Sequence, residues 1–298
     1  MSGSGSQIAA SDFVTIQDKA QSLLGVGSST RGYGQVVQSA DVFTGNQITK
    51  AQWDALRYDI VNIRFHQDGV LPNIVTVNVG DPISYGASAP NTNYNTLIDT
   101  AISNRFQIAT SQSVVTNKGT ATTSSSWSTS AVMTATLTFA NSNEARYFFN
   151  SGGKIRLTTS LTGGNGTQQV NAWTSFLSTT GTQSFGANTN PITNYYSLTN
   201  SYKTYYQGSL STPYSANNII LSAKTDVADN SSGTATVLYL KVALTDAYVD
   251  PGSPAPGDLV TGTLSISVDE LKATGTLTPS GSFAITSPVY SLSSIAVS

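Results

Sequence analysis

The chain has 298 residues, a net charge of -2 and no cysteine. Charged residues make up 10% of it, against about 25% in an ordinary globular protein, whereas 42 Ser and 40 Thr supply small hydroxyl groups. This composition excludes disulfides and thiolate metal sites, and it provides neither the basic surface that nucleic acid needs nor the ~20 successive apolar residues of a membrane helix.

The first predicted helix covers residues 11–25, where apolar residues recur at helical spacing and Gly25 is a C-cap. A glycine-rich segment follows at Gly27, Gly32 and Gly34. It lacks the Lys-Ser/Thr pair of a P-loop, and no strand precedes it as in a dinucleotide site. We therefore expect a helix cap and a loop that lies close to a neighbouring segment, and no phosphate or cofactor site.

The second predicted helix has the clearest start signal of the chain. Thr49 and Gln52 form a capping box, and Ile48 and Trp53 flank it as a hydrophobic staple. Apolar residues after Trp53 fall on one helical face, and Gly69 ends the helix. We expect Thr49, Gln52 and Trp53 to have structural roles.

A third helix is predicted from about residue 92 to 106. The one histidine of the chain, His66, lies near the end of the second helix. A single histidine without cysteine cannot form the usual zinc sets, and a general base needs a partner and a pocket. We expect His66 to be a helix-end or surface residue.

From about residue 112 the apolar period changes to two, as in the half-buried strand predicted over residues 131–139. Further strands are expected at 154–160, 219–225, 234–248, 261–268, 282–286 and 290–297. The Ser/Thr-rich stretch 120–130 is interpreted as a flexible lead-in. The predicted fold class is α+β, mainly β, with a small helical N-terminal region before an antiparallel β-sandwich.

A short helix that ends in a glycine turn is predicted between residues 141 and 153, just before a strand. Its aromatic residues would anchor it on the core. The residues with this expected structural role are Tyr147, Phe148, Phe149, Gly152 and Gly153.

The 46 positions 157–202 carry no charged residue. Because charged side chains normally keep copies of a protein apart, this segment predicts a surface that packs against other subunits. Tyrosines gather at its end and just beyond it, at Tyr195, Tyr196, Tyr202, Tyr205, Tyr206 and Tyr214. Three interpretations of these tyrosines stay open, namely a protein interface, a glycan-binding patch and ordinary sandwich packing.

Acidic residues are concentrated in the C-terminal half, at Asp226, Asp229, Asp246, Asp250, Asp258, Asp269 and Glu270. Paired acids could hydrolyse glycosides or bind calcium, but their spacing matches no known calcium loop. We expect solvated loop acids, and we predict no catalytic, cofactor-binding or metal-binding residue and no cofactor. The chain is expected not to be an enzyme.

Several stretches resemble virion structural proteins of tailed cyanobacterial phages, especially of the contractile-tailed type. They are residues 31–35, 37–39, 49–60, 66–67, and 145–153 with 155–156, and the similarity spans roughly residues 10 to 270. The resemblance implies a particle-associated protein and brings no catalytic residue with it.

Together, these observations predict a non-enzymatic virion structural protein at the tail, neck or baseplate, such as a fibre, collar or decoration component. Its expected divisions are a helical docking region, 1–111, a sandwich, 112–272, and a C-terminal β extension, 273–298, which pairs with another chain or with the N-terminal region. The expected partners are copies of itself, as a trimer or hexamer, and other virion proteins, with no nucleic acid and no membrane. The alternative is a host-receptor module of a tail appendage that binds surface glycan through the tyrosines. Residues 1–10 lack the apolar core of a secretory signal, so we expect a virion protein assembled in the host cytoplasm.

Overall fold

A computed structural model describes residues 10–43, 45–72, 74, 76, 94–188, 190, 192–249 and 259–298. These ranges contain five α-helices and eleven strands, and the strands form two antiparallel sheets. The predicted class, α+β and mainly β with a helical N-terminal region, is confirmed.

The chain forms two compact units, each built from separate stretches of sequence. The helical unit comprises residues 1–114, 146–153 and 272–286, and the sandwich unit comprises 115–145, 154–271 and 287–298. This division differs from three consecutive domains, because residues 146–153 and 272–286 belong with the N-terminal region. The C-terminal stretch 273–298 is shared between the units.

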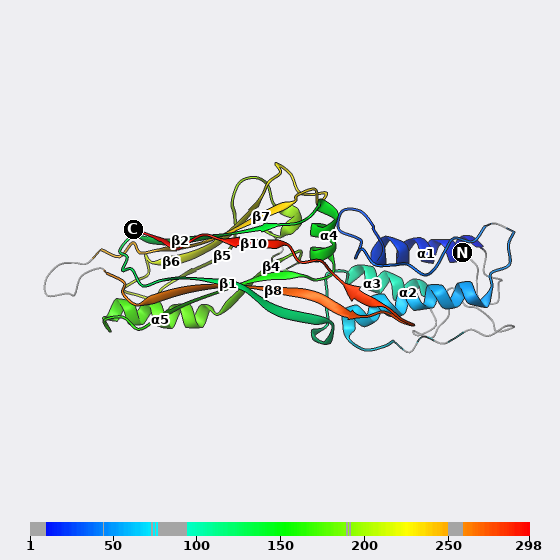
Figure 1. Cartoon of the computed structure of the whole chain (residues 1–298), viewed down its shortest axis with the longest axis horizontal. Helices are drawn as coiled ribbons and strands as arrows, with labels where there is room; N and C mark the ends of the chain where they lie inside the picture. The colour runs from blue at the N-terminus through cyan, green and yellow to red at the C-terminus, as the bar shows by residue number, and fades with distance from the viewer. Residues whose placement is uncertain are drawn as a thin grey trace. The chain divides into compact units, whose positions relative to one another are not determined.

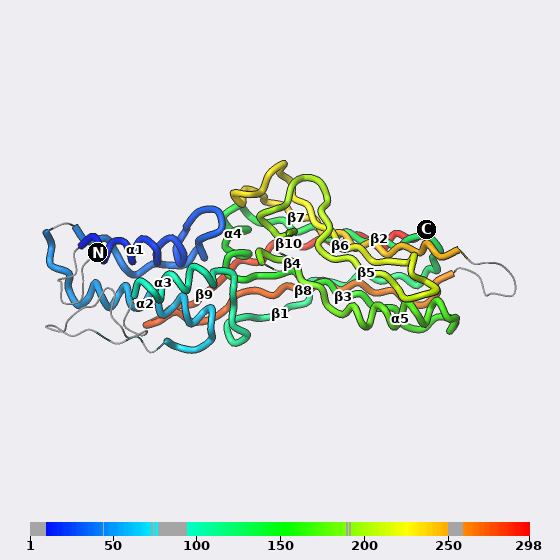
Figure 2. The backbone as a smooth tube through the Cα atoms, turned by 180° about the vertical axis from the view of Figure 1, so that it is seen from behind, coloured from blue at the N-terminus to red at the C-terminus, as the bar shows by residue number. Residues whose placement is uncertain are grey.

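Three helices form the centre of the helical unit: α1 (Ala10–Leu24), α2 (Lys50–Asp68) and α3 (Tyr94–Ser103). They lie side by side in Figures 1 and 2. The ring of Trp53 meets Phe13 at 5.3 Å and Tyr94 at 5.1 Å, both edge to face, so one aromatic cluster joins all three helices.

The predicted capping box of α2 is present, since the Thr49 side chain accepts from the Gln52 backbone N–H and the Gln52 side chain accepts from the Thr49 backbone N–H. Gly69 ends α2 in the left-handed region at φ 73°. The rest of the unit consists of the short helix η1 (Thr110–Gln112), residues of α4 (Ser142–Asn150) from position 146 on, and β9 (Ser282–Ala284), which pairs with the end of β8 (Thr263–Thr276).

The sandwich unit has two sheets (Figure 1). The first sheet has the order β1-β8-β3-β4, with β1 (Ser113–Thr123), β3 (Lys154–Thr162) and β4 (Thr182–Gly186). The second sheet has the order β10-β2-β7-β6-β5, with β11 also on β2; its strands are β2 (Ser130–Thr138), β5 (Lys203–Ser209), β6 (Asn218–Thr225), β7 (Val237–Thr245), β10 (Val289–Leu292) and β11 (Ala296–Val297).

Alternation along the central strands fills the space between the two sheets. On β7 the residues Leu238, Leu240, Val242 and Leu244 are buried, and the residues between them are half-buried. Because side chains alternate across a strand, one face of β7 points into the sandwich and the other points away from it. Phe185 of the first sheet meets Tyr205 of the second, with ring centroids 5.0 Å apart.

The structure adds a helix, α5 (Gln168–Thr180), and a short helix, η2 (Tyr195–Ser197), inside the charge-free segment. Thr167 caps α5, and Val170, Trp173 and Leu177 form its buried stripe. The prediction of a flexible lead-in at residues 120–130 is wrong. Strand β1 extends to Thr123, and Trp127, 2% exposed, forms a β-bridge with Val260.

Candidate functional site

The glycine-rich loop of the helical unit is bound by side chains of the end of α4. The Arg146 Nη2 donates to the carbonyls of Val26, at 2.7 Å, and Arg31, at 3.2 Å. The Asn150 Nδ2 donates to the carbonyls of Ser29 and Gly32, at 3.2 Å each. The glycine-rich loop and the end of α4, which are far apart in the sequence, are therefore packed against each other inside one unit.

The predicted structural residues of the 147–153 segment also lie in this packing. Phe148 and Phe149 are fully buried, and their rings meet edge to face at 5.0 Å. A Cβ at Gly152 would come within 2.8 Å of the Ile108 side chain, and one at Gly153 would lie 2.4 Å from the Phe148 carbonyl. Only glycine fits these two positions, so the motif is a structural one.

His66 lies in the interior of the helical unit. It is near the end of α2, but the prediction of a surface position is wrong. The side chain is 1% exposed, stacks on Phe283 at 4.1 Å, and has its Nε2 3.0 Å from the Ser151 carbonyl oxygen. Burial lowers the pKa of His66 to about 4, since the charged imidazolium would lose its hydration. The ring is therefore neutral at pH 7 and is closed off from any substrate in water.

A polar network surrounds this histidine. Gln67 donates from its Nε2 to the Tyr33 hydroxyl at 2.9 Å and to the Ala101 carbonyl at 2.8 Å. The Tyr33 hydroxyl donates to the Arg105 carbonyl at 2.7 Å, and burial raises the pKa of Tyr33. The network satisfies buried backbone carbonyls, which is a structural task.

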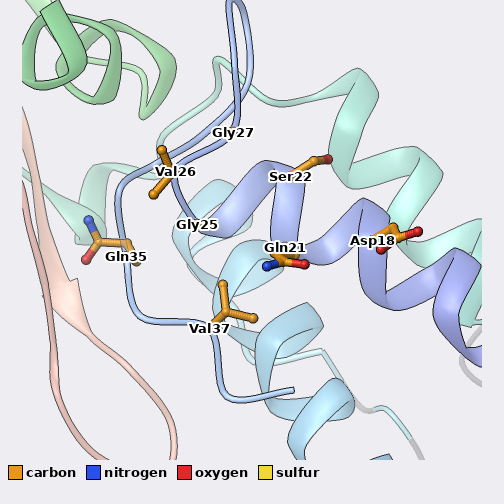
Figure 3. A pocket seen from close by; sticks show the side chains of 8 residues that line it. All are labelled: Asp18, Gln21, Ser22, Gly25, Val26, Gly27, Gln35 and Val37. Carbon is orange, nitrogen blue, oxygen red and sulfur yellow. The ribbon is translucent and has the colours of Figure 1, made fainter. Parts of the chain in front are cut away.

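Figure 3 shows an open depression where α1 meets the glycine-rich loop. Its lining residues are Asp18, Gln21, Ser22, Gly25, Val26, Gly27, Gln35 and Val37. One carboxylate, small residues and two valines form no set that identifies a ligand.

The acidic residues have separate structural partners. Asp226 accepts from the backbone and hydroxyl of Thr236, at 3.1 and 2.8 Å, and Asp229 accepts from Ser231. Asp246 accepts from the buried Gln169 side chain. Asp269 accepts from Asn117 at 2.9 Å, and Glu270 forms an ion pair with Lys118.

The predicted acids Asp250 and Asp258 lie outside the described residues. Within the described ranges, no three His, Cys, Asp or Glu side chains are grouped to hold a metal ion. In the same ranges, no helix combines the length and hydrophobicity that crossing a bilayer requires.

The six predicted interface tyrosines do not form one patch. Tyr195, 1% exposed, donates to the Ala235 carbonyl, and Tyr205, 8% exposed, packs on Phe185. Their side chains fill the interior of the sandwich unit, so the prediction of an interface is corrected for these two. Tyr196, Tyr202, Tyr206 and Tyr214 are half-buried.

Tyr202 belongs to a cluster that lies on the outward face of the second sheet. The ammonium group of Lys224 lies over two rings, 4.9 Å from the centroid of Tyr202 and 5.0 Å from that of Tyr239. The ammonium of Lys241 lies 4.5 Å from the Tyr202 centroid. Two cations and two aromatic rings thus alternate on one surface, which we call the tyrosine–lysine cluster.

Strand register brings this cluster together. Lys224 of β6 is paired with Tyr239 of β7, and Lys241 of β7 is paired with Thr134 of β2. Tyr202 precedes β5, and burial raises the pKa of Tyr202. Its contacts with Lys224 of β6 and Lys241 of β7 place the ring over these two strands.

The two lysines of the cluster differ from Lys118 of the same unit, which is ion-paired with Glu270. Among the described residues, no carboxylate lies within 4 Å of the ammonium of Lys224 or Lys241. A protonated lysine has three donors, and contact with a ring face leaves donors free for an anion. The cluster is the strongest candidate for binding in the sandwich unit.

Sequence reasoning found Tyr202 and missed Lys224, Tyr239 and Lys241. The alternation Tyr239, Lys241 on a strand with four buried aliphatic residues was a usable signal that both residues face outward. Their pairing with Lys224 depends on strand register, which the sequence does not give.

Comparison with protein-family models, with curated proteins and with solved structures finds no match to this chain.

Proposed function

We propose that this protein is a non-enzymatic structural component of a phage virion, associated with its tail, neck or baseplate, and that copies of it assemble through uncharged polar surface. The observation that carries the proposal is the exposed face of α5. The exposed positions on this face are Gln168, Asn171, Ser175, Ser178 and Thr179. None of them carries a charge.

A helix in contact with water normally has charged residues on its outer face, where they oppose association. The α5 face offers amides and hydroxyls, whose burial against another subunit costs much less than the burial of ions. Exposed glycines at positions 163, 164 and 166 precede the helix and extend the uncharged surface. A contact between copies through this face of α5 would bring no like charges together.

The packing of the helical unit supports the same proposal. The stretches that resemble virion proteins supply Arg146, Asn150 and His66, and each of them bonds to, or lies at hydrogen-bond distance from, backbone carbonyls. A resemblance that rests on internal packing fits a shared architecture. We take it as support for a common structural role in a particle.

Location in the particle is tested on purified virions from the source of this sequence. We expect stoichiometric amounts of the chain by mass spectrometry, and labelling by a specific antibody at the tail, neck or baseplate in electron micrographs. Absence of the chain from purified virions would overturn the proposal.

The role of α5 is tested separately, by light scattering of the full-length protein. The double variant Ser175→Glu/Ser178→Glu should reduce the oligomer, expected to be a trimer or hexamer, to smaller species without loss of thermal stability. Ser232→Glu is the matched control, because Ser232 is exposed in a loop that already contains Asp229. An unchanged oligomer in the α5 variant would reject α5 as the interface.

A further inference from the structure

The tyrosine–lysine cluster is a candidate site for a ligand other than a second copy of the chain. We infer that this cluster is a binding site for an acidic polysaccharide, whose carboxylate or sulfate groups pair with the ammonium groups of Lys224 and Lys241. This inference does not depend on the proposed virion role.

The cluster brings two positive charges together. The sandwich unit contains six basic residues, and two of them share the ring of Tyr202. Lys118, by contrast, is paired with Glu270 at 3.2 Å, and Lys203 donates to the Ser197 carbonyl. In the cluster, two cationic groups thus lie on one ring with no carboxylate within 4 Å among the described residues, and an anionic ligand would supply the opposite charge.

The cationic side chains of the cluster are preorganised. Each lysine is held against a ring, so its long side chain has fewer conformations to lose when an anion binds. The Tyr202 ring is in contact with both ammonium groups, at 4.9 and 4.5 Å from its centroid. An anion therefore meets two ammonium groups that are already placed.

Hydroxyl groups lie beside the charges of the cluster. Strand register puts Thr136 beside Tyr239 and Thr134 beside Lys241. Side chains at paired positions of neighbouring strands point to the same face, so these hydroxyls border the cluster. Hydroxyl groups that both donate and accept suit the many hydroxyls of a sugar chain.

The position on a sheet favours a polymer over a small molecule. Small ligands are usually bound in concave sites, whereas this cluster lies on the outward face of β6 and β7, with β2 beside them. An extended sugar chain can lie along such a face and contact it through several residues. An acidic segment of a protein could supply carboxylates, but it would make less use of the bordering hydroxyls.

The test is isothermal titration of the full-length protein at low ionic strength with four polymers of similar length. Polygalacturonate carries carboxylates, dextran sulfate carries sulfates, dextran is neutral, and polyglutamate is an acidic peptide. We expect binding to at least one acidic polysaccharide, no binding to dextran, and much weaker binding to polyglutamate. The preferred acidic polysaccharide identifies the acid group.

The double variant Lys224→Gln/Lys241→Gln should bind about tenfold more weakly or not at all, because two charge-assisted contacts are lost. Lys224→Arg/Lys241→Arg keeps both charges and should retain binding. Lys154→Gln, on the other sheet, removes one charge elsewhere and should have little effect. Circular dichroism and thermal unfolding confirm that each variant is folded.

Three results would overturn the inference: no acidic polysaccharide binds, polyglutamate binds as well as they do, or the Lys→Gln pair binds like the wild type. The second of these would indicate an acidic protein segment as the partner. None of the three depends on whether the protein is found in virions.

Discussion

The Tyr290 hydroxyl donates a hydrogen bond of 2.8 Å to Oε2 of Glu270, a carboxylate in a residue that is only 1% exposed. The other oxygen, Oε1, accepts from the Ser287 hydroxyl at 2.8 Å and lies 3.2 Å from the Lys118 ammonium. Burial, and then the negative charge of Glu270, raise the pKa of Tyr290. One buried carboxylate thus holds the last part of the chain to β8 inside the sandwich unit.

Glu270→Ala should destabilise the protein by about 3 kcal/mol, because it leaves Lys118 and two hydroxyls without their acceptor. Tyr290→Phe should cost about 1 kcal/mol, since it removes one hydrogen bond to a charged group. Urea unfolding measures both values. A smaller loss for Glu270→Ala than for Tyr290→Phe would contradict this role of the carboxylate.

His66 should make stability depend on pH. Its folded pKa is about 4, below the ordinary 6.5, so between these values the unfolded chain binds a proton that the folded chain does not. The contribution to stability is fully present above pH 6.5, declines as the pH falls towards 4, and changes no further below that. The total loss is about 3 kcal/mol.

The measurement is the free energy of unfolding at pH 7 and at pH 4.5, for the wild type and for His66→Gln. The variant removes the titrating group but leaves every carboxylate, so the difference between the two pH dependences belongs to His66. Equal pH dependence in both proteins would show that His66 does not titrate as its burial requires.

Gly34 should tolerate no side chain. Its φ is 68°, and a Cβ there would come within 2.3 Å of the Tyr147 ring. Gly34→Ala should cost more than 2 kcal/mol, from backbone strain of about 1 kcal/mol together with the collision. Gly45 is the matched control, since its φ of 89° is also positive but nothing lies within 4 Å of its Cβ position. Similar thermal unfolding of the two variants would refute the collision.

The capping box of α2 should contribute measurably to the helical unit. Thr49→Ala should lower the free energy of unfolding by about 1 kcal/mol, because the first turn of α2 loses an acceptor for a backbone N–H. Thr15→Ala is the control, since the exposed Thr15 hydroxyl lies within α1 and bonds only to the Ser11 carbonyl. If both substitutions lower the free energy of unfolding equally, the loss in Thr49→Ala does not come from the helix cap.

Local patterns predicted much of the fold. The alternation of residues 131–139 corresponds to β2, and the capping box correctly marked the start of α2. Helix α5 was not predicted, since Ser and Thr at its outer positions are weak helix formers, although the stripe of Val170, Trp173 and Leu177 has helical spacing. Strand β5 was not predicted, although Tyr205 and Tyr206 within it have high β propensity.

The candidate site was harder to predict, because it depends on contacts between distant parts of the chain. Tyr202 and Lys241 are 39 positions apart, and only the register of β6 and β7 brings Lys224 between them. Likewise, no local pattern indicates that His66 stacks on Phe283. Such contacts depend on tertiary pairing, which cannot be inferred from local propensity.

The two units interleave in sequence, since the chain passes between them at five points. A recombination event that exchanged residues 1–111 for those of another protein would separate the glycine-rich loop from Arg146 and Asn150, and His66 from Phe283. Neither unit can be transferred as a continuous piece of gene. Evolution of this architecture should therefore proceed by substitution across the whole chain and not by shuffling of modules.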